Sequence, residues 1–180
     1  MILEGKKIRL RPFEERDLEC IMEWINDHEV TRTLLVGRYP MTRQMEREWL
    51  EARLKGSETE VGFAVETLAG LYLGGISFFR ILAVERHAEL GLVIGRKSEW
   101  GKGYAREAME LMVDYGFRQL NFSMIYLGVL PENTRAHKIY LDLGFREEGR
   151  LRQRVFKDGV YHDIVSMSLL RSEWESSRVR

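Results

Sequence analysis

The segment formed by residues 98–105, Ser-Glu-Trp-Gly-Lys-Gly-Tyr-Ala, places the strongest constraint on the fold of this chain. It joins an apolar run, residues 90–94, to a helical pattern that begins near Gly103. Glycine permits close approach of the backbone to a ligand, because any side chain would block that approach. The N-terminus of a helix carries free N–H groups and the positive end of the helix dipole, which together attract anions. The segment therefore predicts a site for a phosphate-bearing cofactor.

Two well-known phosphate-binding motifs do not fit this segment. The loop that binds nucleoside triphosphates has four residues between its first glycine and a Gly-Lys pair, which Ser or Thr then follows. Here five residues separate Gly95 from Gly101, and Gly103 follows Lys102, so the hydroxyl that would hold magnesium is missing. The dinucleotide fingerprint Gly-x-Gly-x-x-Gly is also absent from the segment. A tight turn between a strand and a helix remains an alternative explanation for the two glycines.

A second segment, about thirty residues downstream, favours a ligand over a simple turn. Asn133 follows a predicted strand that stops at Pro131, and it can cap a helix while it presents its amide to a ligand. Tyr140 lies two helical turns further on, close to the same helix face. A core aromatic residue with a satisfied hydroxyl is the competing interpretation of Tyr140.

Composition narrows the class of protein. The 180 residues suit one domain, and 28 Lys and Arg balance 28 Asp and Glu, so no net charge favours nucleic acid or a membrane surface. The single cysteine, Cys20, excludes an internal disulfide framework, and the 4 histidines lack metal-ligand spacing, so no metal site is expected. No run has signal-peptide or transmembrane length, and we therefore expect a cytoplasmic protein without a membrane partner.

Hydrophobic periodicity predicts one mixed α/β domain. Strands are expected at residues 7–13, 61–67, 71–82, 87–95, 124–130, 146–156 and 160–170, and helices at 14–28, 42–55, 104–120 and 133–143. Thr42 is the expected N-cap of its helix, with Met45, Trp49 and Leu50 facing inward. Residues 30–40 are expected to be irregular, and the polar tail from Arg171 to be weakly organised.

Taken together and in order, these motifs resemble the GCN5-related N-acetyltransferases (the GNAT family), and within them the Rim-type ribosomal-protein and spermidine N-acetyltransferase branch. The resemblance covers nearly the whole chain. It rests on residues 8–12, 17–18, 89–94, 100–105, 107–108, 114–117, Asn133, Ala136, Tyr140, 143–145, 148–152 and the Asp158-Gly159 turn. One position departs from the pattern, because the phosphate loop of the family opens with Gln or Arg where this chain has Ser98. Since loop amides make most of the phosphate contacts, this change bears more on affinity than on family.

The resemblance implies a single GNAT domain over residues 1–180. Its expected form is a mixed, mostly antiparallel sheet of about seven strands, splayed at the cofactor site and flanked by about four helices. Residues 1–60 would form the acceptor side, 86–145 the acetyl-CoA-binding core, and 146–170 a C-terminal hairpin.

The resemblance also assigns the residues that bind acetyl-CoA. The main chain of the last predicted strand residues would pair with the pantetheine amides, and the glycine loop would bind the pyrophosphate. Asn133 would contact the pantetheine arm, and Lys138 could approach the phosphates, although a solvated lysine is equally plausible. The full set is Leu92, Val93, Ile94, Trp100, Gly101, Lys102, Gly103, Tyr104, Ala105, Asn133 and Lys138.

Amine acetylation needs few side chains. A primary amine is protonated near neutral pH and must lose a proton before it attacks the thioester. Glu89 is our candidate for the general base, although an exposed strand carboxylate is an equally good interpretation. Backbone N–H groups near Val93 and Ile94 could polarise the thioester carbonyl. The resemblance assigns Tyr140 as the proton donor to the leaving thiolate, and no acyl-enzyme is needed, so Cys20 has no role.

The identity of the acceptor stays open at the level of sequence. A protein N-terminal α-amine is placed slightly first, on branch resemblance alone, with a polyamine or a small amine such as an amino sugar as alternatives. Asp27 and Glu29 could attract a cationic amine, but Arg32, Arg38 and Arg43 balance them. A non-catalytic acyl-CoA-binding module is a rival from another class, and a homodimer is possible. Release of thiol from acetyl-CoA with a panel of amines separates the enzyme from the module.

Overall fold

The computed structural model describes residues 1–35 and 39–178, so Gly37 and Arg38 of the predicted irregular stretch lie outside the described residues. The described strands are β1 (Leu3–Glu4), β2 (Ile8–Arg11), β3 (Val61–Thr67), β4 (Tyr72–Leu82), β5 (His87–Ile94), β6 (Met124–Val129), β7 (Arg146–Lys157) and β8 (Val160–Leu170). The described helices are η1 (Glu15–Asp17), α1 (Leu18–Ile25), α2 (His28–Thr31), α3 (Arg43–Lys55), η2 (Lys97–Glu99), α4 (Tyr104–Arg118), α5 (Thr134–Asp142) and α6 (Arg171–Arg178).

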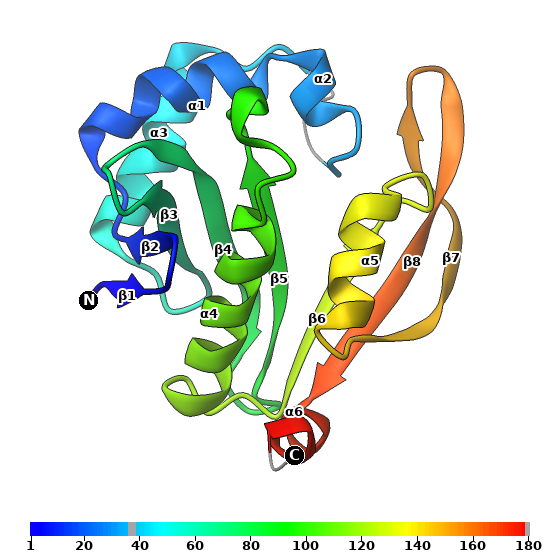
Figure 1. Ribbon diagram of the computed structural model, residues 1–180. Coiled ribbons are helices and arrows are strands. Elements are labelled where there is room, and N and C mark those ends of the chain that lie inside the picture. Colours follow the sequence, from blue (N-terminus) through cyan, green and yellow to red (C-terminus); the bar gives the residue numbers. More distant parts are fainter. Residues whose placement is uncertain (36–38, 179–180) are drawn as a thin grey trace.

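The eight described strands form one sheet in the order β1-β2-β3-β4-β5-β6-β8-β7 (Figure 1). Only the β5–β6 pair is parallel, and the other pairs are antiparallel. The predicted mixed, mostly antiparallel α/β fold is therefore confirmed. The additional strand is β1, whose two residues are too short to leave a hydrophobic pattern in the sequence.

The sheet opens in its middle. β5 and β6 pair only between His87–Glu89 and Met124–Tyr126. Beyond these residues β5 continues to Ile94 along β4, while β6 continues to Val129 along β8. The two strands diverge, and Figure 1 shows the β1–β5 part of the sheet separating from the β6–β8 part. This gap is the splay that the resemblance implies.

Helices cover both faces of the sheet. The larger core cluster lies between the sheet and α4, with α5 packed against it through Ala136, Ile139, Tyr140 and Leu143. A second cluster on the other face joins α1 and α3 to alternate strand residues, including Ala64, Tyr72 and Val93. Neighbouring strand residues thus serve opposite faces, as the two-residue period of a strand requires.

Three local predictions are wrong. The helix expected at residues 14–28 is divided into η1, α1 and α2, because the Asp27 side chain caps a new helix by accepting hydrogen bonds from the amides of Glu29 and Val30. The tail from Arg171 forms α6, whose Trp174 is buried against Phe117 with ring centroids 5.1 Å apart. Met45 is 44 % exposed, although the Thr42 cap and the burial of Leu50 are as predicted.

Candidate active site

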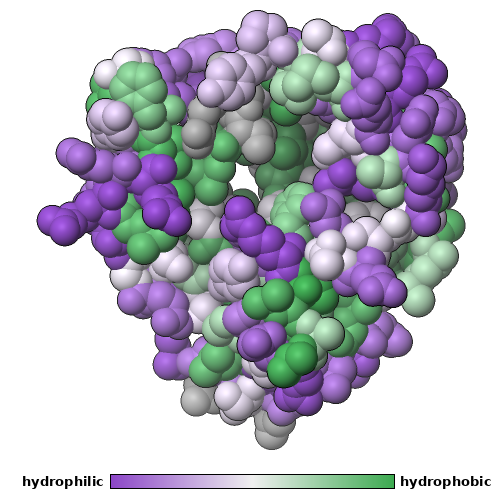
Figure 2. Space-filling view, turned by 180° about the vertical axis from the view of Figure 1, so that it is seen from behind, coloured by the Kyte–Doolittle hydropathy of each residue, from purple (hydrophilic) through white to green (hydrophobic). Residues whose placement is uncertain are grey.

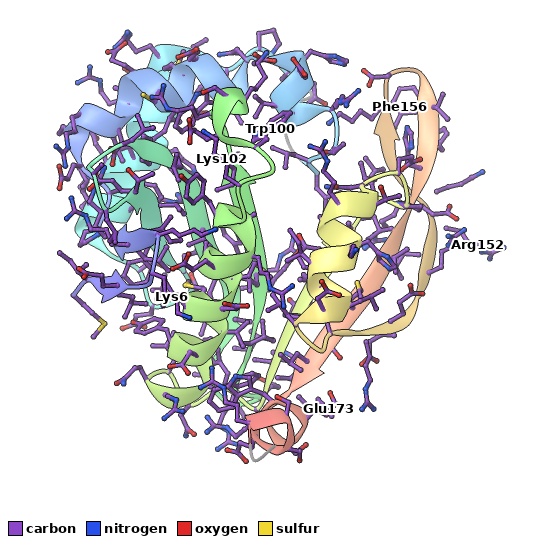
Figure 3. The ribbon with its side chains drawn as sticks, in the orientation of Figure 1. Lys6, Trp100, Lys102, Arg152, Phe156 and Glu173 are labelled. Atoms are coloured by element: carbon purple, nitrogen blue, oxygen red, sulfur yellow. The ribbon has the colours of Figure 1, made fainter. Side chains whose placement is uncertain are left out.

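The loop before α4 has the backbone conformation that its glycines predict. Gly101 and Gly103 have φ angles of +81° and +88°, in the left-handed region that favours glycine. Within the described part of the chain, the amides of residues 101–106 make no hydrogen bond, so they are available to a ligand. The helix they precede is 15 residues long, and its dipole adds to their attraction for an anion. Figure 3 shows Trp100 and Lys102 on this loop.

Charged side chains surround the loop. Lys102 Nζ lies 2.8 Å from Glu99 Oε1, and this ion pair raises the pKa of Lys102. Lys7 Nζ donates a hydrogen bond to the carbonyl oxygen of Lys102 at 3.1 Å, which places a second ammonium beside the loop. Glu107 on the first turn of α4 accepts hydrogen bonds from the amides of Lys6 and Lys7, so the β1–β2 turn is fixed against the helix (Figure 3).

Lys7 is a candidate phosphate ligand that the sequence analysis missed. It is separated from Lys102 by 95 residues, and no local pattern connects the two segments. Only the antiparallel pairing of β2 in the sheet brings the β1–β2 turn to α4.

The end of β5 presents its main chain to the gap. The amide of Gly95 donates to the carbonyl oxygen of Leu73 at 2.9 Å, so residue 95 faces β4. Backbone groups alternate in direction along an antiparallel strand, and those of Leu92 and Ile94 therefore face away from β4, while those of Val93 face β4. The Trp100 indole donates to the Ile94 carbonyl oxygen at 2.7 Å and fixes the loop to the strand. The N–H and C=O groups of Leu92 and the N–H group of Ile94 therefore face the gap and are available to a ligand.

Asn133 and Tyr140 lie on the other side of the gap, on α5. The Asn133 side chain caps the helix by accepting from the Ala136 amide at 3.2 Å, and its Nδ2 donates to the carbonyl oxygen of Thr33 at 3.4 Å. Tyr140 packs between α5 and the sheet, and burial raises the pKa of its hydroxyl to about 12. Among the described residues this hydroxyl makes no hydrogen bond, and no fully buried polar side-chain atom lacks a partner there, so the hydroxyl is accessible and remains a protonated donor at neutral pH.

Glu89 stands at the last paired position of β5, opposite Tyr126 of β6. Its neighbours Ala88 and Leu90 point into the core under α4, so the Glu89 side chain is on the opposite face of the sheet from Tyr140. Its side chain is 22 % exposed, and Oε2 lies 2.5 Å from Nη1 of Arg80. Burial, together with the charge of Glu89, raises the pKa of Tyr126. The candidate general base is thus a carboxylate that is paired with Arg80 and lies where β5 and β6 separate.

The structure brings the predicted residues together around one gap. The loop and the end of β5 form one side, α5 forms the other, and Glu89 lies where the strands separate (Figure 1). Figure 2, which views the molecule from behind, shows an opening through the molecule in this region. Lys138 is exposed on α5, and its contact with phosphate stays a prediction. Among the described residues no group of three or more His, Cys, Asp or Glu side chains could hold a metal ion, and no helix could cross a membrane.

The conformation of the loop leads to a prediction for Gly103→Ala. Alanine disfavours a φ of +88°, so the loop of the free variant relaxes to another conformation. A smaller fraction of the molecules then has the loop conformation that binds the ligand. A strain of about 1–2 kcal/mol corresponds to a loss of about tenfold in affinity for CoA. Isothermal titration with CoA measures this change.

Gly70→Ala is the matched control. Gly70 has a φ of +87° in the turn between β3 and β4, and a Cβ there meets nothing within 4 Å, so the strain is similar although Gly70 lies outside the loop that would bind CoA. Equal affinity losses in the two variants would contradict a specific role for the loop.

Comparisons with known proteins agree with this geometry. Residues 7–146 match the model of the acetyltransferase (GNAT) domain family. The spermidine N(1)-acetyltransferase of Escherichia coli (strain K12) is 32% identical over 171 residues, which is 93% of this chain and 88% of that protein. The putative ribosomal N-acetyltransferase YdaF of Bacillus subtilis (strain 168) is 28% identical over 181 residues, 97% of each chain.

A solved structure gives the same result in three dimensions. The crystal structure of spermidine N-acetyltransferase from Vibrio cholerae in complex with CoA and spermine superposes with a TM-score of 0.87 and 29% identity, and it covers 95% of this chain and 99% of that one. The chain therefore belongs to the GNAT family and is an N-acetyltransferase that uses acetyl-CoA as its cosubstrate.

Proposed function

We propose that this enzyme transfers the acetyl group of acetyl-CoA to a primary amine of a polyamine. The observation that carries the proposal is the similarity, over nearly the whole chain, to spermidine N-acetyltransferases in both sequence and structure. The protein N-terminal α-amine, which the sequence analysis placed first, becomes the second candidate. It is supported by the similarity to the putative ribosomal N-acetyltransferase YdaF.

The gap provides the groups that would bind acetyl-CoA. The amides of residues 101–106 receive the pyrophosphate, with Lys7 and Lys102 as neighbouring cations. Leu92 and Ile94 pair with the pantetheine amides through their main chain, and Asn133 approaches the same arm from α5. In this arrangement the reactive thioester comes close to the place where β5 and β6 separate.

Direct transfer needs one base and one acid. Glu89 takes a proton from the ammonium of the acceptor, and the neutral amine then attacks the thioester carbonyl carbon. The amide of Leu92, which also faces the gap and lies nearer to Glu89, donates to the oxygen that becomes negative. When the C–S bond breaks, Tyr140 donates its proton to the thiolate, and the second proton that the nitrogen loses as the amide forms returns through solvent to the Tyr140 oxygen. The base and the acid lie on opposite faces of the sheet, so each can act on its own side of the gap.

Carboxylates on the acceptor side are held by cations. Glu89 pairs with Arg80, while Asp27 and Glu29 both pair with Lys97 Nζ, at 2.8 and 2.9 Å. The hydrogen bond from Lys97 lowers the pKa of Asp27, so it is ionised at neutral pH. A polyamine would bind by replacing these cations with its own ammonium groups, and this exchange depends on salt.

The proposal is tested by thiol release from acetyl-CoA with a panel of acceptors. The panel contains spermidine, spermine, a peptide with a free N-terminus and glucosamine. We expect kcat/KM for spermidine to exceed that for the peptide by at least about 100-fold, and added salt to raise KM for spermidine but not for glucosamine. A peptide or glucosamine that reacts faster than spermidine would overturn the polyamine proposal.

A further inference from the structure

A stretch of chain, residues 27–35, crosses from one part of the opened sheet to the other, and we name it the bridge. It consists of Asp27, α2 and residues 32–35. At one end Lys97 of η2 pairs with Asp27 and Glu29. At the other end Leu35 packs against the cluster of Leu130, Val155 and Ile164, beside β6, β7 and β8. Figure 1 shows α2 between the loop that precedes α4 and the β7–β8 hairpin.

The tip of the β7–β8 hairpin holds the bridge. Lys157 is only 6 % exposed, and its Nζ donates hydrogen bonds to the carbonyl oxygens of Thr31 at 2.5 Å and Leu34 at 2.9 Å. Asp158 Oδ2 lies 3.4 Å from His28 Nε2. We name these contacts of Lys157 and Asp158 the clasp. A buried ammonium requires partners of this kind, so the contacts fix both the hairpin and the bridge.

The bridge also adjoins the residues that would receive acetyl-CoA. Asn133 Nδ2 donates to the carbonyl oxygen of Thr33 at 3.4 Å, so the middle of the bridge touches the N-cap of α5. The bridge carries two carboxylates, Asp27 and Glu29, as well as main-chain carbonyl groups. Oxygen acceptors of these kinds bind ammonium groups, whereas the phosphates of acetyl-CoA are expected at the amides of α4.

We propose that Lys157 is a positioning residue, which sets the affinity for the amine by holding the bridge, a part of the expected acceptor side, in place. The inference rests on the proposed function only in that the acceptor is an amine. Among the described residues, the hydrogen bonds of the Lys157 ammonium go to carbonyl groups of the bridge and not to the residues assigned to acetyl-CoA, so its replacement should leave the loop before α4 and the end of β5 intact. The two substrates should therefore respond differently to its replacement.

The test is Lys157→Met, which keeps the apolar stem and removes the ammonium. We expect KM for the amine to rise about tenfold, while kcat and KM for acetyl-CoA stay within about twofold of the wild-type values. Lys157→Arg keeps donors for the two carbonyl groups and should restore KM for the amine to within about threefold of wild type. Arg152→Met is the matched control, because Arg152 lies exposed on the same strand without an ion-pair partner among the described residues (Figure 3).

Asp158→Asn tests the clasp if Lys157→Met does not fold. Asp158 and Gly159 have φ angles of +51° and +80°, and Asn-Gly suits such a turn as well as Asp-Gly does. We expect a rise of about twofold in KM for the amine and faster amide hydrogen exchange over residues 28–35, with unchanged exchange in α4. The inference would be overturned if KM for the amine were unchanged in Lys157→Met and Asp158→Asn. It would also be overturned if KM for the amine and KM for acetyl-CoA rose equally. A wild-type enzyme that acetylates another amine instead of spermidine would refute only the polyamine acceptor, because the same comparison then applies to that amine.

Discussion

Tyr140→Phe is expected to lower kcat about 100-fold at pH 7 while the affinity for CoA stays within about twofold. General acid catalysis contributes about 10²–10⁴-fold, and the phenol has no other polar partner among the described residues. Burial raises the pKa of Tyr140 to about 12, so the wild-type residue remains a proton donor across the working range of pH. A thiolate whose thiol has a pKa of about 8.5 needs this proton less as the pH rises. The defect of the variant should therefore shrink between pH 7 and pH 9.5, as measured by thiol release.

Tyr115→Phe is the matched control for this experiment. Tyr115 is a half-buried tyrosine of α4, burial raises the pKa of its hydroxyl, and its ring packs edge-on against Phe63. Loss of this hydroxyl should change neither kcat nor its pH dependence. Equal kcat values for wild type and Tyr140→Phe would remove Tyr140 from the mechanism. A parallel loss of kcat and of CoA affinity would assign it a packing role.

Glu89→Gln is expected to lower kcat/KM for the amine about 100-fold at pH 7, because the amide cannot accept the proton of the ammonium. Below the amine pKa of about 10, the fraction of neutral amine rises about tenfold for each unit by which the pH increases. The loss of kcat/KM in the variant should therefore become smaller as the pH rises. Steady-state kinetics at saturating acetyl-CoA measure this profile. A defect that is constant from pH 7 to pH 9.5 would contradict the role of general base.

Two further variants separate the charge of Glu89 from its surroundings. Glu85→Gln changes an exposed carboxylate in the β4–β5 turn and should leave the kinetics unchanged. Arg80→Gln removes the cation that pairs with Glu89. The Arg80 side chain is 76 % exposed, so this ion pair contributes at most about 1 kcal/mol to stability. We expect KM for a cationic amine to fall about two- to fivefold in Arg80→Gln. A rise in that KM would mean that Arg80 orients Glu89 instead of competing with the substrate.

Local chemistry explains the predictions that the structure confirms. The left-handed φ angles of Gly101, Gly103 and Gly144 follow from the absence of a side chain. The Asp158-Gly159 turn follows from the preference of these two residues for positive φ. Such features depend on a few neighbouring residues, and their signal is therefore present in the sequence.

Other features depend on contacts between distant segments. Trp174 gives the tail a buried position against Phe117, and contacts with distant residues, such as the hydrogen bond from Arg171 Nε to the Phe122 carbonyl oxygen at 2.8 Å, hold the polar segment as a helix. The direction of the main chain at Leu92, Val93 and Ile94 depends on the register between β4 and β5. Sequence reasoning could name this strand, but it could not say which of its amides face the gap.

Local patterns in the amino-acid sequence were enough to locate the anion-binding loop, the helix that follows it, and the candidate residues on α5 and β5. They were enough because glycine conformation, helix capping and hydrophobic period act over a few residues. The contacts of Lys7 with this loop, of Arg80 with Glu89, and of Lys157 with carbonyl groups 123 and 126 residues away are visible only in the folded chain. Contacts of this range arise from the order in which strands join the sheet, and a linear pattern carries no record of that order.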